Sequence, residues 1–285
     1  MKRRKYGAVV LCAAAVLLCL AVTALYTAAF IWTDDTRPPV IAMASDSLEV
    51  SVAATDAELL AGVTAVDARD GDVTDSLVVQ GIDGLADGAV TVTYAAFDAS
   101  GNVAKTTRTV HYTDYQSPKF DLSEALVFTS GTSIDVLDRV LVTDVLDGNI
   151  SNQARATLVS NTGSLSYPGT HQVEFRVTNS LGDTSYLTLP VDVLSVGAYN
   201  ASVELSDYLV YLPQGAEFNA RRYVKSLNNM MDDVITDNVY AMNVNVDGKV
   251  DTDIPGVYSV RYTVSYTWNL IEYVGYTCLN VVVEG

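Results

Sequence analysis

Apolar and polar residues alternate in short stretches from residue 40 to the end of the chain. The clearest pair is residues 89–97 (AVTVTYAAF) and residues 103–112 (VAKTTRTVHY), which flank the five residues DASGN. Strict alternation is typical of a half-buried β-strand, and Gly101 and Asn102 tolerate the positive φ angles of a tight connection. The pattern predicts a β-hairpin at residues 89–112.

The hairpin pattern occurs three times, at offsets of 81 and then 87 residues. Each copy begins with a glycine and has an aromatic residue six positions later. The pairs are Gly88 and Tyr94, Gly169 and Phe175, and Gly256 and Tyr262. Because the three aromatic residues occupy equivalent positions of the alternation, we expect all three to be buried. A period of this length is that of a small domain rather than of a solenoid.

A second element precedes the hairpin in the first two copies. It contains an Asp-x-x-Asp-Gly turn, at residues 67–71 and again at residues 144–148, whereas the third copy keeps only the apolar spacing. Short strands and frequent turns predict an all-β protein with three tandem antiparallel β-sandwiches, joined by short linkers into a semi-rigid rod. The three repeats are expected at residues 38–114, 115–195 and 196–285.

The N-terminus has a different composition. Residues 6–32 form a run of 27 positions without a charge, behind a leader at residues 1–5 in which four of five residues are Lys or Arg. A membrane-spanning helix needs about 20 apolar residues, and basic residues stay on the cytoplasmic side. We therefore expect a single transmembrane signal-anchor helix at residues 6–32, a linker at residues 33–37, and extracellular repeats. A long signal peptide cleaved near Ala28 is the alternative.

Charge and cysteine content limit the partners. Beyond the leader, 13 basic and 34 acidic residues remain, a net charge of −21, which disfavours binding to nucleic acid and to anionic lipid. Cys278 is the only cysteine outside the apolar segment, so no disulfide bond can form within the repeats. Its place in an alternating strand predicts a buried side chain.

The first repeat resembles a known domain type. The segment VDARDGDVTDSLVV, followed by VTVTYAAFDASGNVAKTTRTVHY, is similar to the bacterial immunoglobulin-like repeat of surface proteins. That family includes the Ig-like domain of a pesticidal crystal protein and hyalin-repeat modules. The resemblance extends over residues 38–285 and declines from the first repeat to the third. It implies three Ig-like β-sandwiches that act as stalks or adhesive modules, and it implies no catalytic residues.

No motif predicts catalysis. The sequence contains no nucleophile elbow, no His-x-x-x-His pair and no Gly-rich phosphate loop. His111 and His171 lie in alternating strands and are expected to face solvent. Lys119 and Asn179 are the one pair that resembles the Lys–Asn isopeptide crosslink of related surface domains, but no supporting carboxylate is evident. We expect a protein that is not an enzyme and that uses no cofactor.

An acidic turn in the first repeat is a candidate calcium site. Asp67, Asp70 and Asp72 offer the oxygen ligands that calcium prefers. An Asp-Gly turn whose carboxylates accept hydrogen bonds from backbone N–H groups explains the same residues, and the second repeat has Asn149 in place of the third aspartate. We therefore predict no metal site and no calcium-dependent change in thermal stability.

Tyrosine is frequent in the third repeat. Tyr258, Tyr262 and Tyr266 are spaced so that they share one face of a strand. Core packing and cross-strand contacts explain such a row, whereas an exposed row would form a platform for a sugar or a protein.

These features predict a membrane-anchored bacterial surface protein with a cytoplasmic N-terminus, whose non-catalytic Ig-like rod acts as a stalk or as an adhesive module. One alternative is a carbohydrate-binding module that uses the tyrosine face, and another is an accessory subunit of an envelope complex. The expected partners are the membrane, through the N-terminal helix, and a surface protein or glycan. Nucleic acid is not an expected partner.

Overall fold

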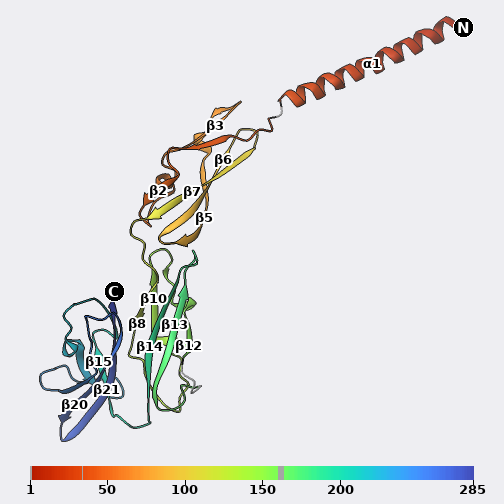
Figure 1. Ribbon diagram of the computed structural model, residues 1–285. Helices are drawn as coiled ribbons and strands as arrows, with labels where there is room; N and C mark the ends of the chain where they lie inside the picture. Colours follow the sequence, from red (N-terminus) through yellow and green to blue (C-terminus); the bar gives the residue numbers. More distant parts are fainter. Residues whose placement is uncertain (1, 34, 160–163) are drawn as a thin grey trace. The chain divides into compact units, whose positions relative to one another are not determined.

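The computed structural model describes residues 2–33, 35–159 and 164–285. The chain begins with the helix α1 (Lys2–Thr33) and then consists mainly of β-strands (Figure 1). It divides into two compact units, Met1–Asp114 and Tyr115–Gly285. The first unit contains α1 and the first repeat, and the second unit contains the other two repeats.

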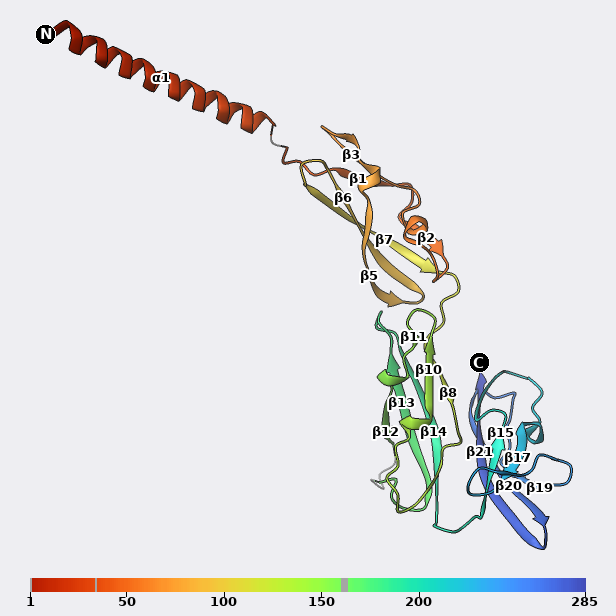
Figure 2. The ribbon, with the colours of Figure 1, turned by 180° about the vertical axis from the view of Figure 1, so that it is seen from behind.

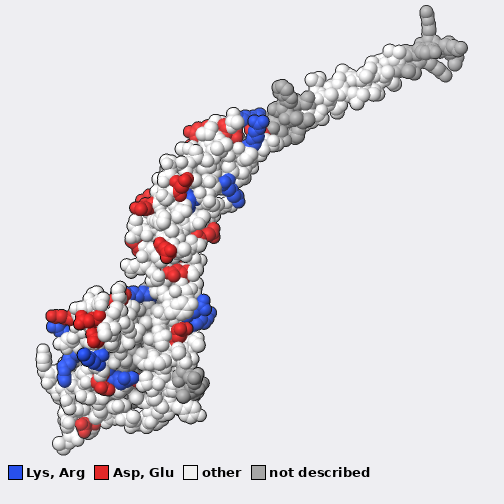
Figure 3. Space-filling view, in the orientation of Figure 1, with Lys and Arg blue, Asp and Glu red and all other residues white. Residues whose placement is uncertain are grey.

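The helix α1 is apolar along its described middle part. The window Val10–Thr27 has a mean hydropathy of 2.4, and none of it is buried inside the protein. Figure 3 shows no charged residue on this part of the helix. The hydroxyl of Thr27 donates a hydrogen bond of 2.9 Å to the carbonyl oxygen of Thr23, which satisfies a polar group on the apolar surface. The helix is long and apolar enough to cross a membrane, and a signal sequence has the same properties.

The first repeat forms two sheets. One has the strand order β1–β3–β4 and the other the order β2–β7–β6–β5. Between β2 and β3, the short helix α2 (Asp56–Leu59) begins with a capping box formed by Thr55 and Glu58. The strands are β1 (Val40–Met43), β2 (Ser47–Val50), β3 (Val63–Asp67), β4 (Gly71–Asp72), β5 (Val78–Ala86), β6 (Ala89–Phe97) and β7 (Val103–Tyr112). The predicted hairpin is therefore the pair β6–β7.

The second repeat has the same layout. Its sheets have the orders β11–β10–β8 and β12–β13–β14–β9 (Figure 2). The strands are β8 (Lys119–Leu122), β9 (Val127–Thr129), β10 (Val140–Asp144), β11 (Gly148–Asn149), β12 (Arg155–Leu158), β13 (Gly169–Thr178) and β14 (Thr184–Leu194). A single 3-10 turn follows β4 in the first repeat and β11 in the second, so the Asp-Gly turn and its surroundings are repeated.

The third repeat has diverged. Its strands belong to one seven-stranded sheet of order β18–β17–β15–β21–β20–β19, and β16 also pairs with β21. The strand β21 pairs with β15 near its start and with β16 near its end, so the sheet encloses one core. The strands are β15 (Ala201–Leu205), β16 (Leu209–Pro213), β17 (Val224–Asn228), β18 (Val234–Thr236), β19 (Asn243–Asp247), β20 (Gly256–Trp268) and β21 (Ile271–Glu284).

The cores lie where the alternation places them. Tyr94, Phe175 and Tyr262 are all fully or almost fully buried, as predicted. The sheets are mostly antiparallel, and each repeat adds parallel pairing between an early strand and its last strand. The chain is therefore an all-β protein of Ig-like β-sandwiches behind one apolar helix.

Candidate functional site

The three aspartates of the predicted calcium turn have different surroundings. Asp67 ends β3 and is 3% exposed, and its Oδ1 atom accepts hydrogen bonds from the backbone N–H groups of Arg69 (2.7 Å) and Asp70 (2.9 Å). The bond from Asp70 is the largest of the causes that lower the pKa of Asp67. The carboxylate is therefore ionised at neutral pH.

The carboxylates of Asp70 and Asp72 also accept hydrogen bonds from backbone N–H groups. The Oδ2 atom of Asp70 accepts a hydrogen bond of 2.9 Å from the backbone N–H of Ala99, which connects the turn to the β6–β7 hairpin. The Oδ1 atom of Asp72 accepts one of 2.9 Å from the backbone N–H of Thr74. The side-chain and backbone hydrogen bonds from Thr74 lower the pKa of Asp72. The carboxylates of Asp70 and Asp72 therefore accept backbone hydrogen bonds, as the Asp-Gly turn interpretation predicts.

Two other carboxylates lie close to Asp67. One carboxylate oxygen from each of Asp35, Asp67 and Asp98 falls within a group in which all three atoms are within 4.8 Å of one another. Asp35 follows α1, and Asp98 is the first residue after β6. Sequence reasoning missed both residues because they are 32 and 31 positions away from Asp67 in the chain. The one signal was that Asp98 aligns with Asn179 in the second repeat.

The tyrosine row of the third repeat faces the core. Tyr262 is fully buried, and its hydroxyl donates a hydrogen bond of 2.9 Å to the carbonyl oxygen of Ala220. Burial raises the pKa of Tyr262. Tyr258 and Tyr266 are partly buried and pack against the same core. In this arrangement the three side chains do not form an open platform for a ligand.

The histidines and the candidate crosslink pair are apart from any common site. His111 is exposed as predicted, but the prediction for His171 is wrong: it is buried, and its Nε2 atom lies 2.9 Å from the carbonyl oxygen of Tyr167. Lys119 forms an ion pair with Glu284, whereas Asn179 donates a hydrogen bond to a different carboxylate. Lys119 and Asn179 therefore have separate partners.

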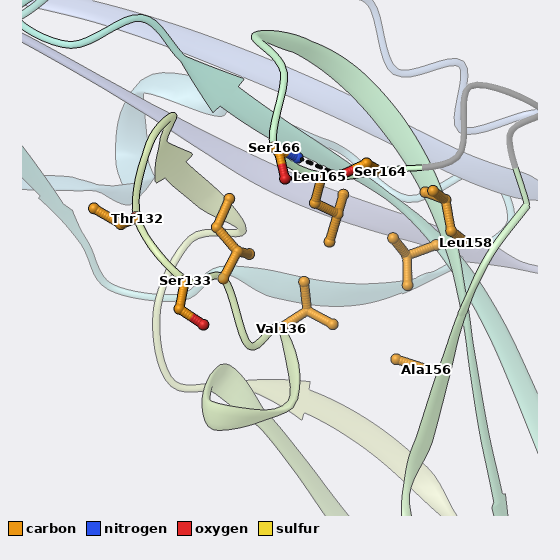
Figure 4. Close-up of a pocket in the computed structure, with 10 residues that line it drawn as sticks. Thr132, Ser133, Val136, Ala156, Leu158, Ser164, Leu165 and Ser166 are labelled. Carbon is orange, nitrogen blue, oxygen red and sulfur yellow. Dashed lines mark hydrogen bonds between the residues drawn. The ribbon is translucent and has the colours of Figure 1, made fainter.

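A hollow of about 470 Å³ lies at one end of the second repeat (Figure 4). Val136, Ala156 and Leu158 contribute apolar carbon atoms, and Ser164 and Ser166 are hydrogen-bonded to each other at its edge. Among the described residues that line it, none carries an acid, a base or a thiol. The hollow offers no pair of groups for general acid–base chemistry.

A buried carboxylate joins the second and third repeats within the second unit. Asp192, on β14, accepts hydrogen bonds from the hydroxyls of Thr170 and Tyr276 (2.6 Å each) and from Nε of Arg261 (3.0 Å). Burial raises the pKa of Asp192, but the hydrogen bonds, led by that from Arg261, lower it further, so the net shift is downward. The side-by-side contact of these two repeats differs from the predicted rod.

The thiol of Cys278 has no accessible chemistry in the folded protein. The side chain is buried, as predicted, and burial raises its pKa to about 12. A thiol with so high a pKa is almost entirely protonated at neutral pH, and the thiolate is the reactive form.

The β20–β21 hairpin ends in an exposed apolar turn. Asn269 and Leu270 form its two-residue loop with φ angles of 50° and 66°, and Trp268 and Ile271 pair on either side. Leu270 is 100% exposed, and about half of each of the flanking side chains is accessible. The turn lies at the free end of the hairpin (Figures 1 and 2). Alternation had predicted the strands, but it carried no information about this turn.

Comparison with known proteins gives a fold type but no family. No family model matches the chain. An uncharacterized 81.3 kDa protein of Acholeplasma phage L2 is 25% identical over 179 residues, which are 62% of this chain and 22% of that protein. The chain therefore spans less than a quarter of the length of this relative.

Among the similar solved structures are cadherin and protocadherin extracellular domains and domains of a clostridial protein. The protocadherin GammaB4 extracellular domain is 10% identical, with a TM-score of 0.19, over 87% of this chain and 49% of its own. The CBM51-2 and INT domains of Clostridium perfringens ZmpB, in complex with GlcNAc, are 15% identical, with a TM-score of 0.22, over 87% of this chain and 44% of theirs. Drosophila N-cadherin EC1-4 is 15% identical, with a TM-score of 0.22, over 78% of this chain and 63% of its own. Such low TM-scores support no argument about function, and the assignment to the general Ig-like β-sandwich type rests on the sheets themselves.

Proposed function

We propose that the protein is a non-catalytic, membrane-tethered surface protein that binds another protein through the turn of the β20–β21 hairpin. The specific relationship to the bacterial Ig-like repeat family, the extracellular position of the repeats and the absence of enzymatic activity are parts of this proposal. The role is that of an interaction module held at a membrane.

The tether is supported by the uncovered surface of α1. Large apolar side chains of this helix, such as Leu11, Leu17 and Leu25, are more than half exposed. Soluble proteins rarely expose contiguous apolar patches larger than a few hundred Å². A lipid bilayer covers such a helix completely, and the basic leader favours a cytoplasmic N-terminus.

The conformation of Leu270 is the observation that carries the binding role. A two-residue turn with positive φ at both positions favours Asn-Gly, and a residue with a side chain costs roughly 1–2 kcal/mol in the left-handed conformation. Leu270 buries no part of its side chain in the protein that would offset this cost. Glycine would serve the turn better, so a leucine at this position is explained by a contact with another molecule.

The chemistry of the turn favours a protein partner. Trp268, Leu270 and Ile271 present an apolar knob that fits an apolar pocket, and exposed aromatic anchors are typical of protein interfaces. The net negative charge of the repeats disfavours insertion of the turn into anionic lipid. The tyrosine row that supported carbohydrate binding faces the core, so we do not extend the proposal to a glycan.

Site-specific photo-crosslinking in the producing cells tests this function. A photoreactive residue at position 270 should give a discrete crosslinked product. The same residue at position 257, which is exposed near the other end of the hairpin, should give none. Equal yields from both positions would contradict a specific contact.

The exchange Leu270→Gly separates a binding role from a structural one. Because glycine adopts positive φ without strain, the variant should unfold at a temperature a few degrees higher than the unaltered chain. A lower unfolding temperature would show that Leu270 stabilises the fold, and the argument from its conformation would then be lost.

A further inference from the structure

The carboxylates of Asp35, Asp67 and Asp98 converge in the first unit without the donors that such a group needs. Asp67 is 3% and Asp98 is 8% exposed, so two of the three charges are almost completely removed from water. The Oδ2 atom of Asp67 is buried and has no hydrogen-bond partner among the described residues. A buried carboxylate oxygen without a partner is costly unless another positive or donating group satisfies it.

The second repeat shows how the same arrangement is satisfied by donors. There, the Oδ2 atom of Asp144 accepts a hydrogen bond of 3.2 Å from Nδ2 of Asn179. Asn179 also donates to the hydroxyl oxygen of Tyr115 (3.0 Å), and that hydroxyl donates to Asp183 (2.6 Å). Each buried polar group of this cluster therefore has a partner of opposite character.

Local hydrogen bonds establish which positions correspond. Oδ1 of Asp98 accepts from the backbone N–H groups two and four residues later, and Oδ1 of Asn179 does the same. Oδ1 of Asp67 and Oδ1 of Asp144 each accept from the N–H groups two and three residues later. Asp35 and Tyr115 each lie three residues before a proline. The corresponding pairs are Asp67 with Asp144, Asp98 with Asn179, Asp35 with Tyr115, and Asn102 with Asp183.

The first repeat therefore has carboxylates at the two positions where the second repeat has an amide and a phenol. Asn102 compensates only in part, since its Nδ2 group donates to Asp98 Oδ2 (2.6 Å) and to the carbonyl oxygen of Asp35 (2.9 Å). This amide leaves the Oδ2 atom of Asp67 without a partner among the described residues.

We propose that Asp35, Asp67 and Asp98 bind one calcium ion, which replaces the sequence-based prediction of no metal site. Three carboxylates form an all-oxygen, strongly anionic group, which suits a hard divalent cation. Oxygens bound to one calcium ion at 2.3–2.6 Å are at most about 5 Å apart. The three oxygens, all within 4.8 Å of one another, meet the limit for calcium without rearrangement.

The ion would fix the segment after α1 to the first repeat. Asp35 is two residues beyond the last residue of the helix, Thr33, whereas Asp67 ends β3 and Asp98 follows β6. Calcium would therefore join three separate parts of the chain and stabilise the first repeat against unfolding. This inference is independent of the proposed binding role of the third repeat.

Calcium titration of the full chain in detergent micelles tests the site. Isothermal titration calorimetry should show one calcium per chain. The unfolding temperature of the first repeat should rise by several degrees with calcium compared with a chelator. Magnesium should bind more weakly. Absence of a saturable calcium site would overturn the proposal.

The exchange Asp98→Asn gives the first repeat the amide that the second repeat has at Asn179. The amide oxygen keeps the two backbone hydrogen bonds, and the amide nitrogen replaces Oδ2, so the hydrogen bond from Asn102 is lost while a donor becomes available to Oδ2 of Asp67. The variant should therefore fold and lose calcium binding. Calcium binding at unchanged affinity would exclude Asp98 as a ligand.

The matched control is Asp72→Asn, which removes one negative charge from the same turn. The second repeat has Asn149 at this position, and its Oδ1 atom accepts from the backbone N–H of Ser151 as Asp72 does from Thr74. The control should keep the full calcium response. Loss of calcium binding in this control alone would move the site to the turn and would contradict the assignment to Asp98.

Discussion

The contact between the second and third repeats depends on Asp192, and its replacement by asparagine is a direct test. The side chain accepts hydrogen bonds from Thr170, Arg261 and Tyr276. Asp192 (β14) and Thr170 (β13) belong to the second repeat, whereas Arg261 and Tyr276 belong to the third. Asparagine has the same shape but offers one acceptor oxygen and no charge. All three donors would therefore lose the negative charge of their acceptor. In either orientation of the amide, its NH2 group would also face Arg261 and one of the two hydroxyls, which would lose that hydrogen bond.

The expected loss is about 3 kcal/mol. A hydrogen bond to a charged group contributes about 1.5–3 kcal/mol, and the exchange weakens or removes about two of them. Breaking a buried ion pair by changing one partner costs about 3–5 kcal/mol. The side chain of Asp192 is 6% exposed but that of Arg261 is 31% exposed, so water recovers part of the loss and the lower end applies. For a unit of this size, each kcal/mol corresponds to about 2–4 °C.

The same exchange should change the pH dependence of stability. The folded pKa of Asp192 lies below its ordinary value of about 3.9, so the ionised group stabilises the fold fully above that pH. This stabilisation is lost as the pH falls from about 4 through the folded pKa. The asparagine variant should lack this acid-dependent component.

Urea denaturation of the full chain in micelles, followed by tryptophan fluorescence and circular dichroism, measures the effect. The control is Glu284→Gln, which removes the ion pair between Lys119 and Glu284, another contact between the same two repeats. That pair is 47% and 51% exposed, so its loss should cost less than about 1 kcal/mol. A cost for Asp192→Asn no larger than that of the control would refute the argument that this carboxylate couples the repeats.

Two further outcomes are expected. Phe175→Ala should destabilise the second repeat by about 3–5 kcal/mol in the same denaturation assay. Phe175 is 1% exposed, and the centroid of its ring lies 6.4 Å from that of Phe120. A cost below about 1 kcal/mol would show that the site is not tightly packed. The unaltered chain should remain in the membrane fraction after carbonate extraction, and protease added to intact cells or protoplasts should remove the repeats; a soluble chain that begins near residue 30 would instead identify a cleaved signal peptide.

Local alternation was sufficient for the strands and for much of the core. Tyr94, Phe175 and Tyr262 could be placed inside from sequence because side chains on a strand point to opposite faces in turn. The same rule explains the interpretation of His171 that the geometry changed. His171 has the parity of Phe175, so its position in the strand outweighed its polar character. Tyr258 and Tyr266 have the parity of Tyr262 and pack against the same core.

The candidate sites depended on long-range contacts. Asp35, Asp67 and Asp98 are separated by about thirty residues each, and only the folding of the first repeat brings the segment after α1, the end of β3 and the end of β6 together. Likewise, Asp192 and Arg261 belong to different repeats, and no local pattern indicates that their strands touch. Sequence periodicity reports which face of its own strand a residue occupies, whereas the meeting of distant carboxylates is decided by how sheets and repeats pack on one another.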